Sequence, residues 1–219
     1  MEILTQEWLS SIKYISGGII VTLEYTLISV ALGLILGSLL ALSKLSHNKF
    51  LQIFASSYVS IFRGTPLLIQ LSLVYFAIPT LIHYKMSVFE AGIIAFSLNS
   101  AAYVCEIIRA GIESIDKGQF EASKALGIPY TAMMKDIIFP QAIKNILPAL
   151  VNEVINLLKE TAIISIIGGA DLMARAQIVV AEKYSYFIPL FIASIYYYIL
   201  VEILSYFAKI LERKLKTND

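Results

Sequence analysis

The sequence predicts an all-α membrane protein with five transmembrane helices, and three observations support this fold class. Hydrophobic residues make up 58% of the 219 residues and charged residues only 15%, whereas a soluble domain is about half apolar and about a quarter charged. Five apolar stretches are each long enough to cross a bilayer, which takes roughly 20 helical residues. Lysine and arginine are also concentrated in the connections that would lie on one side of the membrane.

The five predicted spans belong to a single transmembrane domain that covers residues 1–219. A short amphipathic helix at 6–16 is expected to rest on the membrane surface before them. The second apolar run, 51–82, is too long for one straight crossing and is interrupted just before Pro66. We therefore expect 51–62 to run near the cytoplasmic face and the second span to begin at Pro66. The expected spans are 18–43, 66–82, 88–108, 146–167 and 186–210.

The distribution of positive charge predicts the orientation of the chain. Connections on the cytoplasmic side of a membrane protein carry an excess of lysine and arginine. The connections after the first, third and fifth spans hold most of these residues, whereas the opposite side holds Lys13, Lys85, Arg175 and Lys183. We therefore predict that the N-terminus lies outside and the C-terminus in the cytoplasm, which agrees with an odd number of spans.

The connection at 109–145 is the longest polar segment, and the predicted orientation places it in the cytoplasm. Residues 119–126 are good helix formers, and Gly127 and Pro129 follow them as stop signals. Pro140 suits the first turn of the next helix, where its missing N–H is not needed. In a chain whose other connections are short, this segment is the natural place for a functional contact.

The chain contains no recognisable catalytic or metal-binding pattern, so we expect no catalytic residue and no bound metal. The Gly-rich phosphate-binding loop that ends in Gly-Lys-Ser/Thr is absent. The single cysteine, Cys105, lies in an apolar run, and the two histidines, His47 and His83, fall in connections on opposite sides. Any step driven by ATP would therefore need a partner protein.

The predicted third span carries a stripe of polar side chains. Asn99, Tyr103 and Glu106 are spaced i, i+4 and i+7, which places them on one helical face. Such a face is expected to point toward the other helices rather than toward lipid. Glu106 and Arg109 lie near the cytoplasmic end of the span, where they could pair or extend toward the membrane surface.

The predicted fourth span carries a second stripe, with Glu153, Asn156 and Glu160 at i, i+3 and i+7. A carboxylate at the depth of Glu153 would cost about 2.5 to 3.5 kcal/mol if it faced lipid. The two stripes are therefore expected to line a polar cavity, in which an uncompensated Glu153 would suit an ammonium or guanidinium group. Lys159 and Glu160 are expected to pair with neighbours. The candidate substrate-binding residues are Glu153, Asn156, Asn99, Asn152 and Tyr103; for the three asparagines, hydrogen bonding between helices is an equal alternative.

Within the 109–145 connection, an acidic residue and two small residues are followed at fixed spacing by a glycine and an Ile-x-Phe-Pro sequence: Glu121, Ala122, Ser123, Gly127, Ile137, Phe139 and Pro140. This pattern resembles the Glu-Ala-Ala…Gly…Ile-x-Leu-Pro loop of the membrane subunits of ABC importers. Ser123 replaces the second alanine and Phe139 the leucine, and both changes keep size or apolar character.

Further blocks are similar to the polar amino-acid branch of that family, the histidine/glutamine/arginine permeases. Together they span residues from about 20 to 210. They are Arg63-Gly64-Thr65-Pro66-Leu67-Leu68, Asn99-Ser100-Ala101-Ala102-Tyr103 with Glu106 and Arg109, Lys117-Gly118-Gln119, and Asn152-Glu153 with Lys159-Glu160-Thr161.

The resemblance implies a type I ABC importer permease fold, located in the bacterial cell membrane, that imports polar L-amino acids, with Glu153 favouring basic ones. The implied partners are an ABC ATPase subunit, a second permease subunit that is a copy or a relative of this chain, an extracytoplasmic amino-acid-binding protein, the amino acid and membrane lipid, but no nucleic acid. ATP and magnesium are expected in the ATPase, and no cofactor in this chain. The residues assigned to ATPase coupling are Glu121, Ala122, Ser123, Gly127 and Pro140.

Two other functions are compatible with parts of the sequence. A secondary transporter or an ion channel could use the intramembrane carboxylates as proton or cation sites, although it would have no need of the spacing at 121–140. A membrane enzyme could use Glu153 or Glu160 as an acid or base, but no nucleophile accompanies either residue at a recognisable spacing.

Overall fold

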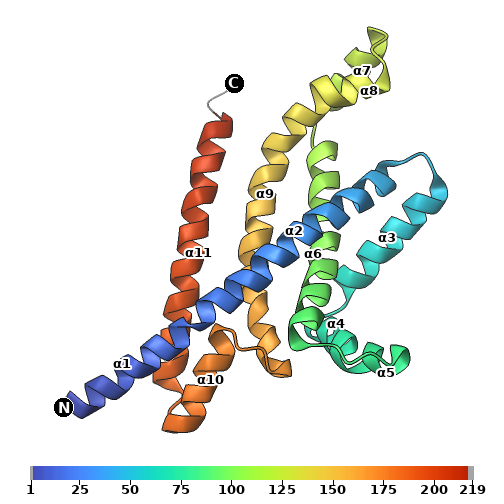
Figure 1. The fold of residues 1–219 in the computed structure, drawn as a ribbon. Helices are drawn as coiled ribbons and strands as arrows, with labels where there is room; N and C mark the ends of the chain where they lie inside the picture. Colours follow the sequence, from blue (N-terminus) through green and yellow to red (C-terminus); the bar gives the residue numbers. More distant parts are fainter. Residues whose placement is uncertain (1, 217–219) are drawn as a thin grey trace.

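A computed structural model describes residues 2–216 of the chain, and side chains from 8 to 214. Throughout these residues the regular structure is helical, without a β-strand (Figure 1). In chain order the elements are α1 (Glu2–Ser16), α2 (Gly18–Leu45), α3 (Lys49–Gly64), α4 (Leu67–Ser72), the π-helix η1 (Leu73–Ala77), α5 (Ile78–Ile82), α6 (Val88–Glu113), α7 (Lys117–Ala125), α8 (Tyr130–Ala132), the π-helix η2 (Met133–Ile138), α9 (Phe139–Glu160), the 3₁₀ helix η3 (Thr161–Ile167), α10 (Leu172–Lys183) and α11 (Phe187–Lys216).

Three helical stretches are long and apolar enough to cross a membrane: Trp8–Leu45, Val88–Glu113 and Phe187–Lys214. Two further pairs of helices qualify only as bent units, Lys49–Gly64 with Leu67–Ile82 and Tyr130–Ile167 with Leu172–Lys183. Counting each bent pair as one span gives five spans among the described residues. The first stretch includes the helix expected at 6–16, since α1 continues into α2 with only Gly17 between them (Figure 1).

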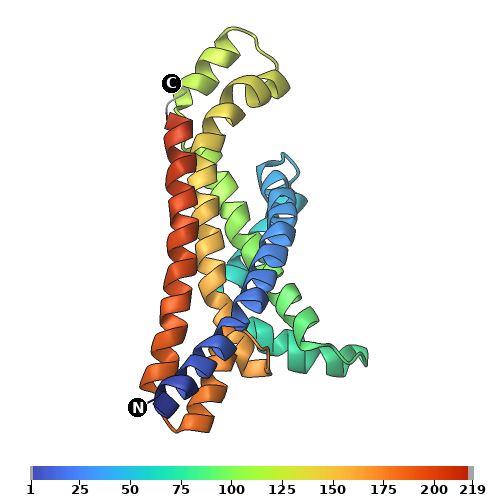
Figure 2. The same ribbon diagram turned by 60° about the vertical axis from the view of Figure 1, so that its left-hand side comes forward.

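The second apolar run is bent by 102° at the expected position, between α3 and α4. Thr65 has the extended backbone (φ −123°, ψ 144°) that the residue before a proline favours. We expected 51–62 to run near the cytoplasmic face and the span to begin at Pro66, and the arrangement in the structure is different. Instead, α3 packs beside α2 and α6, and α4 to α5 turn away across one end of the bundle (Figures 1 and 2).

Both π-helical segments lie just before a proline. Leu73–Ala77 precedes Pro79, and Met133–Ile138 precedes Pro140. A proline lacks the N–H that would bond to residue i−4 and its ring crowds that carbonyl, so a locally wider turn accommodates it. The helix of the fourth predicted span consequently runs on from this segment and starts before residue 146, and its last part, Thr161–Ile167, is a 3₁₀ helix.

Helices α2 and α6 approach each other closely because α2 carries glycine at the contact. A Cβ atom at Gly33 would lie 2.9 Å from the Cβ of Ser100, and one at Gly37 would lie 2.6 Å from the Cβ of Val104. This is the Gly-x-x-x-Gly spacing by which membrane helices pack backbone against backbone. The close approach fixes α6, and with it the polar stripe that begins at Asn99.

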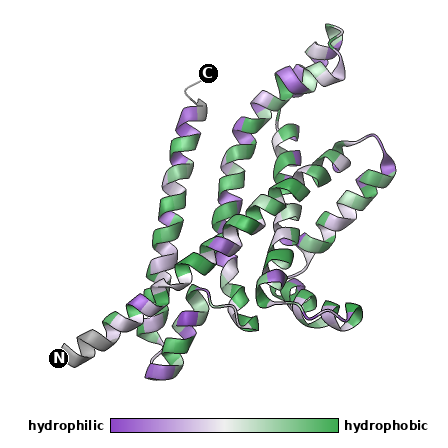
Figure 3. Cartoon of the chain, in the orientation of Figure 1, coloured by the Kyte–Doolittle hydropathy of each residue, from purple (hydrophilic) through white to green (hydrophobic). Residues whose placement is uncertain are grey.

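The two ends of the molecule differ in hydropathy and in the helices that lie there. Helices α7 and α8 project from one end, with the last turn of α11 at the same end and the first turn of α1 at the other (Figures 1 and 2). Hydrophobic residues cover most of the long helices, whereas hydrophilic residues gather around α7 and α8 (Figure 3). This division matches a bundle embedded in lipid with one polar projection.

Candidate functional site: a polar face between two helices and a projecting loop

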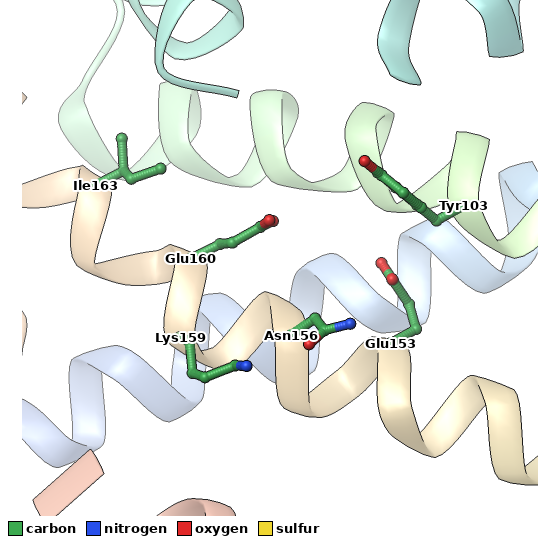
Figure 4. Close-up of a pocket in the computed structure, with 6 residues that line it drawn as sticks. All are labelled: Tyr103, Glu153, Asn156, Lys159, Glu160 and Ile163. Carbon is green, nitrogen blue, oxygen red and sulfur yellow. The ribbon is translucent and has the colours of Figure 1, made fainter. Parts of the chain in front are cut away.

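The polar stripes of α6 and α9 face one another and line a cavity of about 460 Å³. Tyr103 extends into it from α6, and Glu153 and Glu160 point toward it from α9 (Figure 4). Asn156, Lys159 and Ile163 complete the lining. The sequence spacing therefore predicted correctly that the two faces meet.

Glu153 is the most enclosed carboxylate of this cavity. It is 8% exposed, and its Oε1 accepts a hydrogen bond of 2.9 Å from the hydroxyl of Ser100 on α6. No lysine or arginine of the described residues forms an ion pair with it. One hydroxyl donor is little compensation for a buried negative charge.

Asn99 also contributes to the packing between elements. Its Nδ2 donates to Oε1 of Gln70 at 3.1 Å, and Gln70 in turn donates from Nε2 to the carbonyl of Phe62 at 2.8 Å. Gln70 thus supplies a hydrogen-bond donor to a backbone carbonyl at the end of α3, where the bend leaves carbonyls without helical partners. Asn99 therefore forms the hydrogen bond between helices that was the alternative to substrate binding. It also lines a second cavity.

The second cavity, of about 410 Å³, adjoins the first because Tyr103 and Glu160 line both. Its other walls come from Asn99 and from the bend itself, 63–67. Asn152, by contrast, is exposed and lines neither cavity. Of the five candidate residues, Glu153, Asn156, Asn99 and Tyr103 are brought together, and Asn152 is not.

A cluster of charges surrounds Glu106 at the other end of the α6 stripe. The expected pair with Arg109 is present, with Nη2 of Arg109 at 2.9 Å from Oε2 of Glu106. Lys44 from the end of α2 pairs with the same carboxylate, and Arg63 from the end of α3 lies 3.4 Å from it. Sequence spacing could not find these two partners, because both come from other helices.

Lys159 and Glu160 do not form the ion pairs that the sequence predicted, as far as the described residues extend. Both side chains line the first cavity instead. The reason lies in the helix geometry: Glu160 is the last residue of α9, and its side chain points across to α6 (Figure 4). Glu160 therefore joins the candidate site.

The projecting loop has the helix and the cap that its sequence predicts. Asp116 caps α7 by accepting from the N–H of Gly118 at 2.6 Å. Gly127 has φ +71°, and the N–H groups of Gly127 and Ile128 donate to the carbonyls of Lys124 and Ser123, both at 3.0 Å. This pair of bonds is the Schellman motif, which ends a helix with a glycine in the left-handed region.

The coupling candidates on α7 differ in their exposure. Glu121 and Ala122 are exposed, whereas Ser123 is buried and donates from Oγ to the carbonyl of Gln119 at 2.7 Å. Pro140 is exposed in the first turn of α9, as expected. The five coupling candidates are thus two exposed residues of α7, one buried residue of the same helix, the glycine of its cap and the proline at the start of the helix that carries Glu153.

Comparison with known proteins identifies the family. The binding-protein-dependent transport system inner membrane component family matches residues 33–217. The chain belongs to that family. Membership makes the chain a membrane translocation subunit of an ABC transporter, a permease that works beside an ATPase, a binding protein and a second permease subunit.

Individual permeases are similar in sequence to this chain along nearly its whole length. A Rickettsia felis protein, provisionally named as the glutamine transport system permease GlnP, is 60% identical over 94% of this chain and 95% of its own length. The arginine transport system permease ArtQ of Bacillus subtilis is 52% identical over 95% of each chain. These relatives confirm the resemblance to polar amino-acid permeases.

Solved structures support the same assignment. A chain of an amino acid ABC transporter crystallised with histidines superposes with a TM-score of 0.91 at 42% identity, covering 95% of this chain and 97% of that one. A chain of the methionine transporter MetNI in an inward-facing conformation has a TM-score of 0.76 at 20% identity, covering 92% and 96%, and shares the fold.

Proposed function

We propose that this permease forms the translocation pathway of an ATP-driven importer for polar L-amino acids, and that basic amino acids are among its substrates. The observation that carries the proposal is the buried carboxylate of Glu153, which faces a cavity and lacks a cationic partner among the described residues. The names of the relatives, for glutamine and arginine transport, favour the same class of substrate.

The cavity suits the side chain of a basic amino acid. Its wall carries the carboxylates of Glu153 and Glu160 and the ammonium of Lys159, so negative charge is in excess. A guanidinium or ammonium group entering the cavity would supply the cation that Glu153 lacks. The amide of Asn156 and the hydroxyl of Tyr103 would serve neutral polar side chains such as that of glutamine.

Coupling to ATP is proposed to occur through α7 and the cap that follows it. The exposed surface of α7 around Glu121 and Ala122 would seat in a groove of the ATPase subunit, and buried Ser123 would anchor the helix to this chain. Movement of α7 would pass through 128–138 to Pro140 and α9, whose far end carries Glu153 and Glu160. The chain itself would perform no covalent chemistry.

The proposed assembly places five spans in the bacterial cell membrane, with the N-terminus outside and the C-terminus in the cytoplasm. A second permease subunit, either a copy or a close relative, would complete the pathway, since the polar cavity of one chain opens to its surroundings. An extracytoplasmic amino-acid-binding protein would deliver the substrate. The ATPase would hold ATP and magnesium.

Binding and co-purification test this proposal together. The full-length chain would be co-expressed with its ATPase, purified in detergent and titrated with L-arginine, L-lysine, L-glutamine and L-glutamate. We expect the ATPase to remain bound, and L-arginine to bind at least tenfold more tightly than L-glutamate. A chain that purifies without an ATPase, or that prefers L-glutamate, would contradict the proposal and favour a secondary transporter.

A further inference from the structure

The second cavity has opposite charges on its walls. Arg63, in the last turn of α3, lies on one side, and Glu160, the last residue of α9, on the other. Asn99 and Tyr103 of α6 line the space together with them. An amino acid in solution carries one carboxylate and one ammonium close together, so a small cavity with one guanidinium and one carboxylate has complementary charge.

Arg63 is the least firmly held cation of the Glu106 cluster. Its Nη1 lies 3.4 Å from Oε2 of Glu106, and its side chain is 44% exposed. Arg109 donates to Glu106 from both Nε and Nη2, and Lys44 also pairs with it. The charge of Glu106 is therefore satisfied without Arg63.

The cluster around Glu106 has more cations than carboxylates. Three cations, Lys44, Arg63 and Arg109, share two carboxylates, Glu106 and Glu113, and Glu113 pairs with Arg109 alone among the described residues. One positive charge thus remains in excess. Because Arg63 has the longest of these contacts and borders the cavity, the excess is available there.

Arg63 is held by Tyr103 at a position where a ligand in the cavities could contact it. Its guanidinium carbon lies 5.4 Å from the centre of the Tyr103 ring, and such stacking keeps the planar group oriented while its N–H donors stay free at the edge. Tyr103 lines the first and second cavities and also a third, of about 640 Å³, that reaches toward Asn145. Arg63 lines the second and third, so it lies where these spaces adjoin.

We propose that Arg63 binds the α-carboxylate of the amino acid in transit, with Glu160 facing its α-ammonium group. A guanidinium binds a carboxylate through two parallel hydrogen bonds, which a lysine cannot reproduce. The side chain of the ligand would then extend into the adjoining first cavity toward Glu153. This inference rests on the proposed function. It adds that the permease selects ligands with a free α-carboxylate, whatever their side chain.

The test compares each amino acid with its α-amide, which lacks the negative charge. The complete transporter, reconstituted in lipid nanodiscs, would be titrated with L-arginine and L-argininamide, and with L-glutamine and L-glutaminamide. We expect the wild type to bind each acid at least tenfold more tightly than its amide. In Arg63→Gln this ratio should fall to near one through weaker binding of the acid, and Arg63→Lys should retain part of it.

Lys44→Gln is the matched control, because it also removes one positive charge beside Glu106 but lines none of the three cavities. It should keep the acid-to-amide ratio of the wild type. An unchanged ratio in Arg63→Gln or, if that variant does not fold, in Arg63→Lys, would overturn the inference and leave the proposed function intact. Failure of the wild type to bind any of the four compounds would overturn both.

Discussion

The carboxylate of Glu153 lies where its burial costs free energy unless another group compensates for it. Ser100 supplies one hydrogen bond, and the described part of the chain supplies no ion pair. Intramembrane carboxylates that lack a partner mark sites for ions or substrates more often than sites of packing. Substrate charge is therefore the property that this residue is expected to select.

Replacing Glu153 by glutamine should keep the hydrogen bond to Ser100 and remove the charge. We expect binding of L-arginine by the purified transporter to weaken about tenfold, equivalent to about 1.4 kcal/mol, with a smaller change for L-glutamine. Glu202→Gln on α11, an exposed glutamate that lines none of the three cavities, is the matched control. Equal affinity of Glu153→Gln and wild type for L-arginine would rule out this role.

The residues of the site could be predicted from sequence only where they share a helix. Helical periodicity identified the stripes that hold Tyr103 and Glu153, since residues three and four apart share a face. Arg63 and Gln70 were missed as site residues because their positions depend on the bend at Pro66, which brings the end of α3 against α6. Asn152, a candidate that lies beside the predicted face, lines none of the three cavities, since one step along a helix turns a side chain by about 100°.

At the scale of elements, prolines and glycines decide where helices bend and end. Pro66 gave the position of the 102° bend, because the residue before it must be extended. The sequence did not show that α3 packs along α2 and α6 while α4 and α5 cross one end of the bundle. That depends on side chains such as Ala55 and Val59 on α3, which are buried against α2 and α6.

The cap at Gly127 offers a test of coupling that does not touch the cavity. A Cβ at this position meets no atom within 4 Å, so a substitution acts only through the backbone, which is held at φ +71°. Gly127→Ala should disfavour this conformation by about 1 kcal/mol or more, and Gly127→Asn should disfavour it less, since asparagine tolerates the left-handed region.

The expected result is a graded loss of ATP-driven uptake, with Gly127→Ala more impaired than Gly127→Asn. Amino-acid binding should stay the same in both variants, because the cavity lies at the other end of α9. Uptake rates in proteoliposomes and equilibrium binding of L-arginine measure the two quantities. If both variants transport as fast as the wild type, the capped helix does not transmit the motion.

A buried aspartate fixes the corner where η3, α10 and α11 meet. Asp171 is 0% exposed, accepts from the N–H of Ala174 at 2.9 Å and accepts from the hydroxyl of Tyr197 at 3.0 Å. The first bond caps α10, and the second attaches it to α11. The hydroxyl of Tyr197 thus has a specific bonding role beyond packing.

Asp171→Ala and Tyr197→Phe should each lower stability, by about 1 to 3 kcal/mol for a buried hydrogen-bonding group that loses its partner. Because the two changes remove the same bond, the double variant should lose less than the sum of the single effects. Thermal unfolding of the purified chain measures this, with Tyr198→Phe as control because Tyr198 is 65% exposed. Strictly additive effects would show that the bond contributes nothing.

At the scale of the whole molecule, much apolar surface remains uncovered. Helix α11 carries exposed Phe191, Ile203 and Phe207, and Figure 3 shows hydrophobic residues along the outer sides of the long helices. Lipid and a second permease subunit would both cover such a surface in the proposed assembly. Composition predicted this feature, since a chain so poor in charge cannot present a polar exterior.

Uptake into proteoliposomes tests whether this permease imports amino acids by means of a partner's ATP hydrolysis. Vesicles would contain the full-length chain, its ATPase and its binding protein, and labelled L-arginine would be offered on the side that the binding protein occupies. We predict accumulation that requires ATP on the opposite side and that proton or sodium gradients neither replace nor accelerate. Accumulation driven by such a gradient in the absence of ATP would contradict it.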